Sequence, residues 1–231
     1  MTTIAAPSHR ASVTWDQHLL QITLVISRLG LAYLFFSQLF WKLPPHFGCP
    51  AGDSFAFTTV SAEGHLARTS GLCDWLGIEA IYSTRERSFF VTDFNNDGVP
   101  EIGSSLSGPV RLNGLFVENI VMPNLSWFGW LIWLAEAFIV VSMALGVFSR
   151  LGVLVSISIS LQLMLGLAGV WDPVSDLQEW EWTYHMIVLF SIVMLGVAPG
   201  RMLGLDALLR PQLMAAAAKG NRLARLLLAF T

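Results

Sequence analysis

This chain of 231 residues is too apolar and too poor in charge to be a water-soluble domain: hydrophobic residues make up 54% of the sequence, charged residues 13%, and the formal net charge is −3. The composition therefore predicts an integral membrane protein that lies in a lipid bilayer, and we expect no nucleic-acid partner. Nine tryptophans, a residue type enriched at membrane interfaces, agree with this class.

Four apolar windows are long enough to cross a bilayer as helices. A helix of about 20 residues, rising 1.5 Å per residue, spans the roughly 30 Å hydrocarbon layer. The windows are residues 19–41, 127–148, 151–171 and 182–203. The sequence therefore predicts an all-α integral membrane fold, a bundle of four transmembrane helices. Residues 1–17 lack a small-residue cleavage site after a short apolar core, so we expect no removed signal peptide.

The positions of basic residues predict how the chain is oriented. We expect an N-terminus with the first span (residues 1–43), an inserted extracytoplasmic domain with short strands (44–125), the second to fourth spans (126–204) and an amphipathic C-terminal helix (205–231). Arg150 lies between the second and third spans and more basic residues follow the fourth, whereas residues 172–181 contain acids but no Lys or Arg. Since cytoplasmic loops carry an excess of basic residues, both termini should be cytoplasmic and the insertion outside, in a bacterial or archaeal plasma membrane.

Both cysteines of the chain, Cys49 and Cys73, lie in the inserted segment. An even number of cysteines in an oxidising compartment predicts one disulfide. It would close a loop of about 25 residues and remove on the order of 3 kcal/mol of unfolded-chain freedom. Two free thiols remain the alternative.

Residues 93–101 read Asp-Phe-Asn-Asn-Asp-Gly-Val-Pro-Glu, a pattern typical of a calcium-binding turn. Oxygen ligands recur at the spacing that calcium loops use, and the glycine permits the sharp turn. The predicted ligands are Asp93, Asn95, Asp97, the carbonyl of Val99, and Glu101. The loop differs from an EF-hand, because Ser104 stands where a bidentate Glu would and the flanks, residues 88–92 and 99–102, read as strands. An ordinary turn joining two strands is the alternative.

Two ionisable residues lie deep within the predicted spans, where a charge costs roughly 2.5–3.5 kcal/mol on insertion scales. Arg28 lies near the middle of the first span and Glu136 near the middle of the second, with Gln162 of the third span at a similar depth. We expect Arg28 and Glu136 to pair. Two interpretations are open: the pair only fixes helix packing, or this layer, together with Tyr33, binds a polar head such as a quinone carbonyl or moves protons.

Several short motifs stand at corresponding places in and beside the spans. They are Arg28-Leu-Gly-Leu-Ala-Tyr-Leu-Phe-Phe-Ser through Lys42, Glu136 followed by Leu145-Gly-Val-Phe-Ser-Arg150, Trp182, and Gly196-Val-Ala-Pro-Gly-Arg201 leading to Leu205-Asp206. In these the chain resembles the DoxX family, which includes the DoxD-type small subunit of thiosulfate:quinone oxidoreductase. The resemblance implies a four-helix membrane bundle in a respiratory or redox context. Residues 44–111 are an addition to the basic pattern of that family.

Two classes of function remain open. One is a DoxX-like membrane subunit of a quinone-linked oxidoreductase, or of a larger respiratory or photosynthetic electron-transfer complex, with a quinone bound beside the polar layer. The other is a non-catalytic membrane scaffold whose calcium-stabilised outer segment docks an extracytoplasmic partner.

Other cofactors are less expected. The sequence has no Rossmann fingerprint, Walker loop or nucleophile elbow, so any redox cofactor should belong to a partner subunit. Haem ligation by His46 and His185 is not expected, because His46 follows two prolines in a loop and His185 beside Tyr184 fits an interfacial position.

Overall fold

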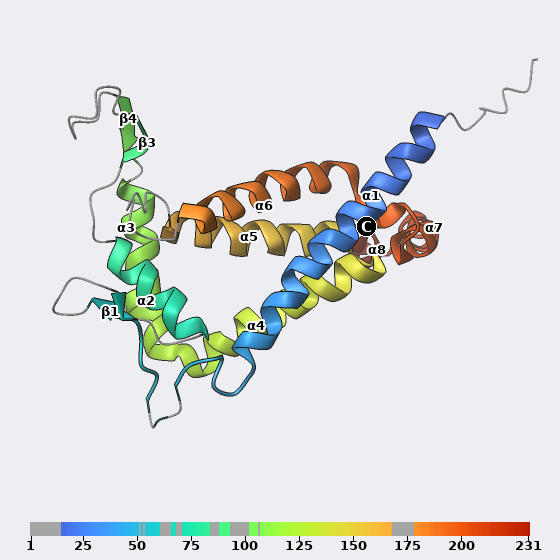
Figure 1. Ribbon diagram of the computed structural model, residues 1–231. Coiled ribbons are helices and arrows are strands. Elements are labelled where there is room, and N and C mark those ends of the chain that lie inside the picture. The colour runs from blue at the N-terminus through green and yellow to red at the C-terminus, as the bar shows by residue number, and fades with distance from the viewer. Residues whose placement is uncertain are drawn as a thin grey trace, which may run out of the picture.

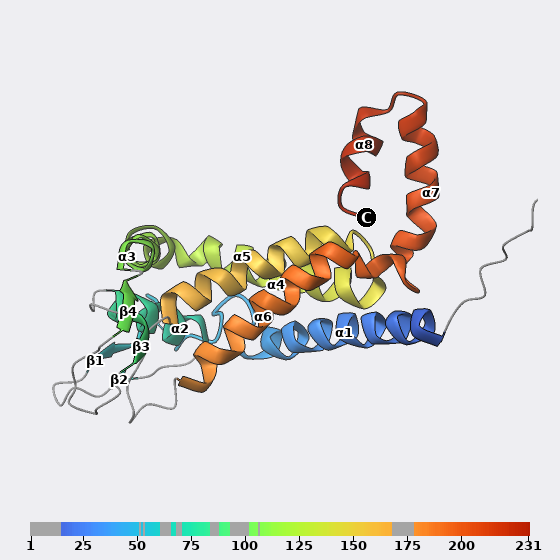
Figure 2. The ribbon, with the colours of Figure 1, turned by 90° about the horizontal axis from the view of Figure 1, so that it is seen from above.

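The computed structural model describes residues 15–50, 52, 54–60, 66–67, 71–83, 88–92, 102–105, 107–167 and 178–231. Four long helices run alongside one another and form the body of the molecule (Figures 1 and 2). They are α1 (Trp15–Leu39), α4 (Leu125–Leu145), α5 (Ser149–Leu167) and α6 (Gln178–Val197). Helix α1 continues for one 3₁₀ turn as η1 (Phe40–Lys42).

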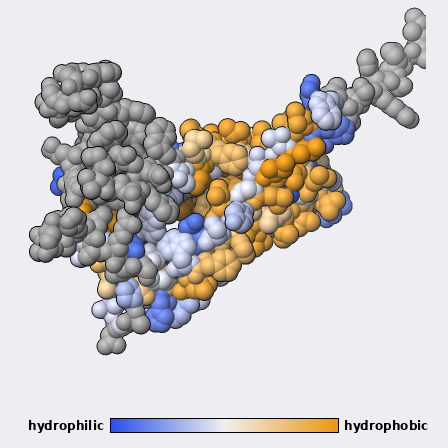
Figure 3. All heavy atoms as spheres, viewed as in Figure 1, coloured by the Kyte–Doolittle hydropathy of each residue, from blue (hydrophilic) through white to orange (hydrophobic). Residues whose placement is uncertain are grey.

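Among the described residues, three helical stretches are long and apolar enough to cross a membrane. These are Trp15–Lys42, Gly108–Leu145 and Ser149–Leu167, while the described side chains of α6 give a shorter apolar helix, Thr183–Val197. Hydrophobic side chains cover most of the visible face of the bundle (Figure 3). The chain is therefore a helical protein suited to a lipid bilayer, with several apolar helices.

Apolar side chains from all four helices fill the centre of the bundle. α1 packs mainly on α4, and α5 mainly on α6. The buried residues of this core are Leu24, Leu31, Ala32, Phe35, Ile139, Met143, Val153 and Met194. Other large apolar side chains point outward, as they should where the surrounding solvent is lipid.

A second helical path leads into α4. Helix α3 (Ser107–Phe116) passes through a π-helical turn, η2 (Val117–Val121), and a 3₁₀ turn, η3 (Met122–Asn124), before α4 begins. Pro123 lacks an amide hydrogen, so the regular hydrogen-bond ladder cannot continue through it. The path changes direction here, and α3 lies steeply across the end of the bundle (Figure 1).

The inserted segment forms α2 (Gly71–Ser83) and two short antiparallel strand pairs. Strand β1 (Thr59–Val60) pairs with β2 (Leu66–Ala67), and β3 (Ser88–Thr92) pairs with β4 (Ile102–Ser105). β3 has the bounds predicted from the sequence, whereas β4 starts at the last residue of the predicted strand 99–102. The predicted calcium loop, residues 93–101, lies outside the described residues.

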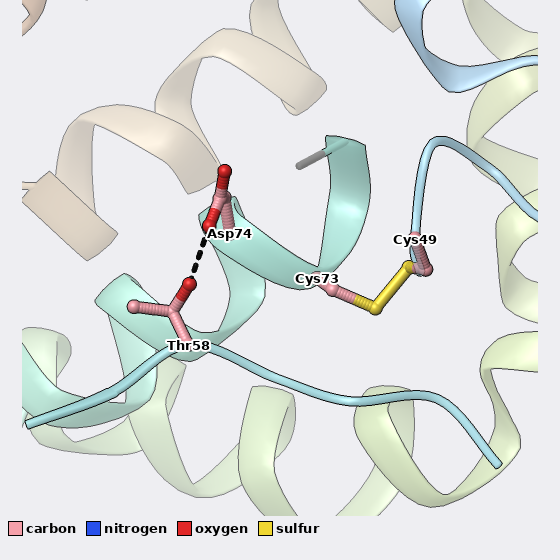
Figure 4. The surroundings of a disulfide bond; sticks show 4 residues. All are labelled: Cys49, Thr58, Cys73 and Asp74. Carbon is pink, nitrogen blue, oxygen red and sulfur yellow. Dashed lines mark hydrogen bonds between the residues drawn. A yellow bond between two sulfur atoms is a disulfide. The ribbon is translucent and has the colours of Figure 1, made fainter. Parts of the chain in front are cut away.

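A disulfide ties α2 to the chain that follows α1, which confirms the predicted pairing of Cys49 with Cys73. Their Cα atoms are 5.4 Å apart and 24 positions separate them in the sequence. Beside it the Thr58 hydroxyl donates a hydrogen bond to Asp74 Oδ1 at 2.5 Å (Figure 4). This part of the molecule, with α2 and α3, is called the disulfide end.

The opposite end of the bundle is held by Asp206. This end, called the C-terminal end, contains η4 (Pro199–Arg201) and α7 (Leu205–Ala218). The fully buried Asp206 carboxylate accepts hydrogen bonds from Phe148 N at 2.7 Å, Ser149 N at 2.9 Å and Ser149 Oγ at 2.6 Å. Because Ser149 begins α5, Asp206 caps that helix and fixes the α4–α5 turn against α7.

The C-terminal region is two helices, so the single amphipathic helix predicted over residues 205–231 is wrong. α7 ends at Ala218, and α8 (Arg222–Leu228) runs back beside it in a hairpin that projects from the bundle (Figure 2). Gly220 takes a left-handed conformation with φ of 89°, which lets the chain reverse. Asn221 Oδ1 then accepts a hydrogen bond from Ala224 N at 3.1 Å and caps the new helix.

Replacing Asp206 by Ala should lower the unfolding free energy by about 3 kcal/mol, because three buried donors lose a charged acceptor. The measurement is unfolding of the purified protein in mixed detergent micelles. Asp16→Ala, which removes an exposed carboxylate of α1, is the control and should change stability by less than about 0.5 kcal/mol. Equal stability of the two variants would contradict the role of Asp206 as a clamp.

Candidate functional site

A partly open cavity of about 430 Å³ lies between α1, α2, α4, α5 and α6, toward the disulfide end. Its volume is within the range of small-molecule pockets, about 300–1,000 Å³. Most of its lining is apolar, and this wall includes Leu34, Phe35, Leu76, Phe128, Ile132 and Leu163. Its polar side chains include Lys42, Glu79, Glu136, Gln162 and Tyr184.

Lys42 and Glu136 form a buried ion pair on one side of the cavity. Lys42 Nζ is 2.5 Å from Glu136 Oε1, and both side chains are almost wholly buried. Lys42 ends η1 and Glu136 lies in α4, so the pair joins the first and second long helices. Glu136 Oε2 has no hydrogen-bond partner in the described part of the chain. A buried pair of this kind is strongly sensitive to loss of either partner, since the remaining charge is left uncompensated.

Glu79 lies on α2 and is fully buried. Its Oε2 atom accepts hydrogen bonds from Gln162 Nε2 of α5 and, at 3.4 Å, from Asn113 Nδ2 of α3. Burial raises the pKa of the Glu79 carboxyl to about 8, although both amide hydrogen bonds act in the opposite direction. At neutral pH the carboxyl is therefore mostly protonated and uncharged.

Gly166 lets α5 come close to Glu79. A Cβ atom at Gly166 would lie 2.5 Å from Glu79 Cδ, closer than such atoms can approach. The absence of a side chain at this position is thus what allows the carboxyl to lie between the two helices.

Tyr184 of α6 forms another wall of the cavity. Its ring meets the Trp75 ring edge-on, with centroids 6.1 Å apart. It lies close enough to Glu79 and Glu136 to interact electrostatically with both carboxyl groups. The cavity therefore brings together polar groups from α1–η1, α2, α4, α5 and α6 within an apolar surround.

The predicted pairing of Arg28 with Glu136 is wrong, although both residues are buried as expected. Arg28 Nη2 donates to Leu203 O at 3.4 Å at the C-terminal end, where the opposite charge that acts on Arg28 is that of Asp206. Fourteen residues, about 21 Å of helix, separate Arg28 from Lys42. Lys42 pairs with Glu136 instead, because its long flexible side chain reaches back into the bundle from the end of the helix.

The other predicted polar residues divide between the cavity and the outer surface. Gln162 lines the cavity, as the binding hypothesis requires, and its partner is Glu79. Tyr33 is 69% exposed on α1 and is not part of the lining, so the structure does not bring it to the polar cluster.

Sequence reasoning missed three residues of these buried networks. Lys42 and Asp206 both lie within the motifs that resemble those of the DoxX family, but the sequence alone assigns neither of them a role. Glu79 is the single charged residue in the apolar stretch 75–83, and this isolation is the signal that could have identified it.

Metal binding stays a prediction. Within the described ranges, no group of three His, Cys, Asp or Glu side chains is placed to hold a metal ion. The proposed calcium ligands Asp93, Asn95, Asp97, Val99 and Glu101 are not among those residues.

Comparisons with protein-family models, with curated proteins and with solved structures found no match to this chain. The fold and the cavity define a helical membrane protein with an apolar pocket that carries a few convergent polar groups.

Replacing one residue of the Lys42–Glu136 pair should destabilise the protein more, per substitution, than replacing both residues together. Lys42→Met or Glu136→Leu alone should lower the unfolding free energy by about 3–5 kcal/mol, because each leaves a buried charge unpaired. The double variant should be more stable than the sum of the single losses implies. A double-mutant cycle measured in detergent micelles checks this, with Ser158→Ala on the exposed face of α5 as control. Additive losses would show that the two groups do not interact.

Proposed function

We propose that this chain is a DoxX-like membrane subunit of a quinone-linked oxidoreductase, or of a larger respiratory or photosynthetic electron-transfer complex, and that its cavity takes a quinone head. One observation carries the proposal. Glu79 Oε1 and Glu136 Oε2 are buried oxygens without hydrogen-bond partners in the described part of the chain, and both residues line the same apolar cavity. Buried polar atoms are normally satisfied, so a pair of such atoms at one pocket favours a polar ligand between them.

The cavity residues fit a quinone. A quinone head is a flat, largely apolar ring with carbonyl oxygens at opposite edges, and its isoprenoid tail is soluble in lipid. The apolar lining suits the ring, and the partial opening between helices suits entry from the bilayer. Lys42 Nζ carries three N–H donors, of which Glu136 accepts one, so it can also donate to a carbonyl.

The redox reaction would be shared with other subunits. A bound quinone would supply the electron-accepting chemistry, and a partner subunit would supply the electrons. The residues of this chain would position the ring, keep water from it and hold protons at the cavity carboxyls. Lys42 also holds Glu136 in place, which fixes one polar edge of the pocket.

We also infer that α6 is a fourth span, with both termini cytoplasmic and the disulfide end outside a bacterial or archaeal plasma membrane. α6 has 20 residues, enough to cross, and carries exposed apolar side chains at Met186, Leu189, Ile192 and Val193. Arg150, Arg201 and Arg210 gather at the C-terminal end, as cytoplasmic loops favour. The disulfide at the other end fits an oxidising compartment.

This orientation would put the predicted calcium loop, residues 93–101, on the outer side. Calcium is abundant there, so even a weak site could fill, which supports the proposal that calcium steadies the chain between β3 and β4.

The topology can be tested with single cysteines added to a chain whose own cysteines are joined. A membrane-impermeant maleimide should label Ser54→Cys, next to the disulfide, in intact cells. It should label Gln212→Cys on α7 only after the membrane is opened. Both positions are exposed. Labelling of both from outside would mean that α6 does not cross.

The quinone site can be tested by filling it. A photoreactive azidoquinone should attach saturably to the wild-type protein, and decylubiquinone should compete with it. Ala135→Phe, which pushes a ring into the cavity, should reduce attachment at least about tenfold, or 1.4 kcal/mol. Leu134→Phe changes the exposed neighbour and should leave attachment unchanged. Equal attachment to both variants would contradict the proposal and favour the scaffold alternative.

A further inference from the structure

The two oxygens of the Glu79 carboxyl lie in different surroundings. Oε2 accepts hydrogen bonds from the amide groups of Gln162 and Asn113, the latter at 3.4 Å. Oε1 is buried and has no hydrogen-bond partner in the part of the chain that the structure describes. The carboxyl is therefore satisfied on one side only, at a residue that lines the cavity.

A proton on this carboxyl belongs on Oε1. Both neighbours of Oε2 are N–H donors, so a hydrogen on Oε2 would point at other hydrogens. Among the described residues no cation is paired with the Glu79 carboxyl, and the ammonium of Lys42, which lines the same cavity, is paired with Glu136. Burial raises the pKa of Glu79 to about 8, so the acid form predominates at neutral pH. The result is a buried O–H donor without an acceptor in the described chain.

We infer that Glu79 acts as an uncharged carboxylic acid that donates a hydrogen bond from Oε1 to a carbonyl oxygen of the ligand in the cavity. The inference rests on the proposed function and adds the direction of the hydrogen bonds to the ligand. Glu79 donates at one edge of the site and Lys42 can donate at another. Two donors match the two carbonyl acceptors of an oxidised quinone, whereas Glu136 Oε2 can only accept and would be met by a hydroxyl of the quinol. Glu79 is thus a specificity residue that favours the oxidised ligand over the quinol.

This role of Glu79 determines how the affinity for the quinone changes with pH. Below about pH 8 Glu79 is a donor and carbonyl binding is strongest. Above that value it ionises and becomes an acceptor, so quinone binding weakens and quinol binding gains. Among the described side chains, the other titratable or charged groups on elements around Glu79 are Lys42 on η1, Asp74 on α2, Arg111 on α3, Glu118 on η2, Glu136 on α4, Arg150 at the far end of α5, and Tyr184 and His185 on α6.

Tyr184 lies in the same cavity as Glu79, whereas several of the other groups have partners of their own or are exposed. Asp74 accepts from Thr58, and Arg111 and Glu118 are exposed. Lys42 and Glu136 are paired with each other. The variant Glu79→Gln therefore isolates the titration of Glu79, because its amide keeps an N–H donor at this position but does not ionise.

The first measurement is the infrared carbonyl band of protonated carboxylic acids, recorded on the full chain in lipid nanodiscs at about pH 6. The wild-type protein should show a band that Glu79→Gln lacks. Decylubiquinone should shift it to lower frequency, because a hydrogen bond weakens the acid carbonyl. A missing band, or a bound quinone that leaves the band unshifted, would overturn the inference.

The second measurement is the dissociation constant of decylubiquinone and of its quinol as the pH rises from about 6 to about 9. Wild-type affinity for the quinone should fall several-fold while affinity for the quinol rises. Glu79→Gln should show neither trend, and Glu79→Leu should bind the quinone about tenfold more weakly throughout, a loss of about 1.4 kcal/mol. Thermal unfolding of each variant checks that it is folded.

The outcomes separate this inference from the proposed function. A wild-type protein that shows the acid band but binds no quinone would overturn both the function and the ligand assigned to Glu79. A protein that binds quinone with the same pH dependence in Glu79→Gln as in wild type would overturn the role of Glu79 alone. Tighter quinone binding at high pH would do the same, since an ionised carboxylate cannot donate to a carbonyl.

Discussion

The ion pair between Lys42 and Glu136 determines how the disulfide end of the bundle is built. Neither charge can be solvated among apolar helices, so each holds the other in place and thereby joins the end of α1–η1 to the middle of α4. Beside this link lies the cavity, which both Lys42 and Glu136 line. α2, tied to the chain after η1 by the Cys49–Cys73 disulfide, closes that space and brings Glu79 to it.

At the C-terminal end a buried carboxylate is stabilised mainly by backbone N–H donors, and not by a cation in direct contact. Asp206 takes its hydrogen bonds from the start of α5, so its charge is offset by oriented N–H groups and, more distantly, by Arg28. Glycines make the approach possible: a Cβ atom at Gly200 would lie 2.6 Å from Ser149 Oγ. This end is therefore packed closely, and the cavity lies toward the other end. The two ends therefore differ: one is closely packed around Asp206, and the other holds the cavity.

The apolar windows and the cysteine pair could be predicted because hydrophobic length and oxidising context act locally along the chain. The ion pairing could not, because it depends on which side chain reaches which depth. Lys42 lies just beyond the apolar window 19–41, so the sequence places it outside the bundle, yet its stem returns inside. The sequence does not show the role of Glu79 for a related reason: it predicts an inserted segment apart from the spans, whereas α2 packs on α5. The break at Gly220 is a single-residue effect within an otherwise helical pattern.

The two cavity carboxyls show how surroundings assign different states to one chemical group. Glu136 has a cation at 2.5 Å and forms half of an ion pair. In the described part of the chain Glu79 has two amide donors and no counter-charge, and its burial favours the neutral acid. A pocket with a fixed ion pair on one side and a neutral acid on the other is polar without carrying a large net charge, which suits an uncharged ligand that arrives from lipid. In the proposed function, such a site would bind a carbonyl compound and hold a proton beside it at Glu79, while a partner subunit would supply the electrons.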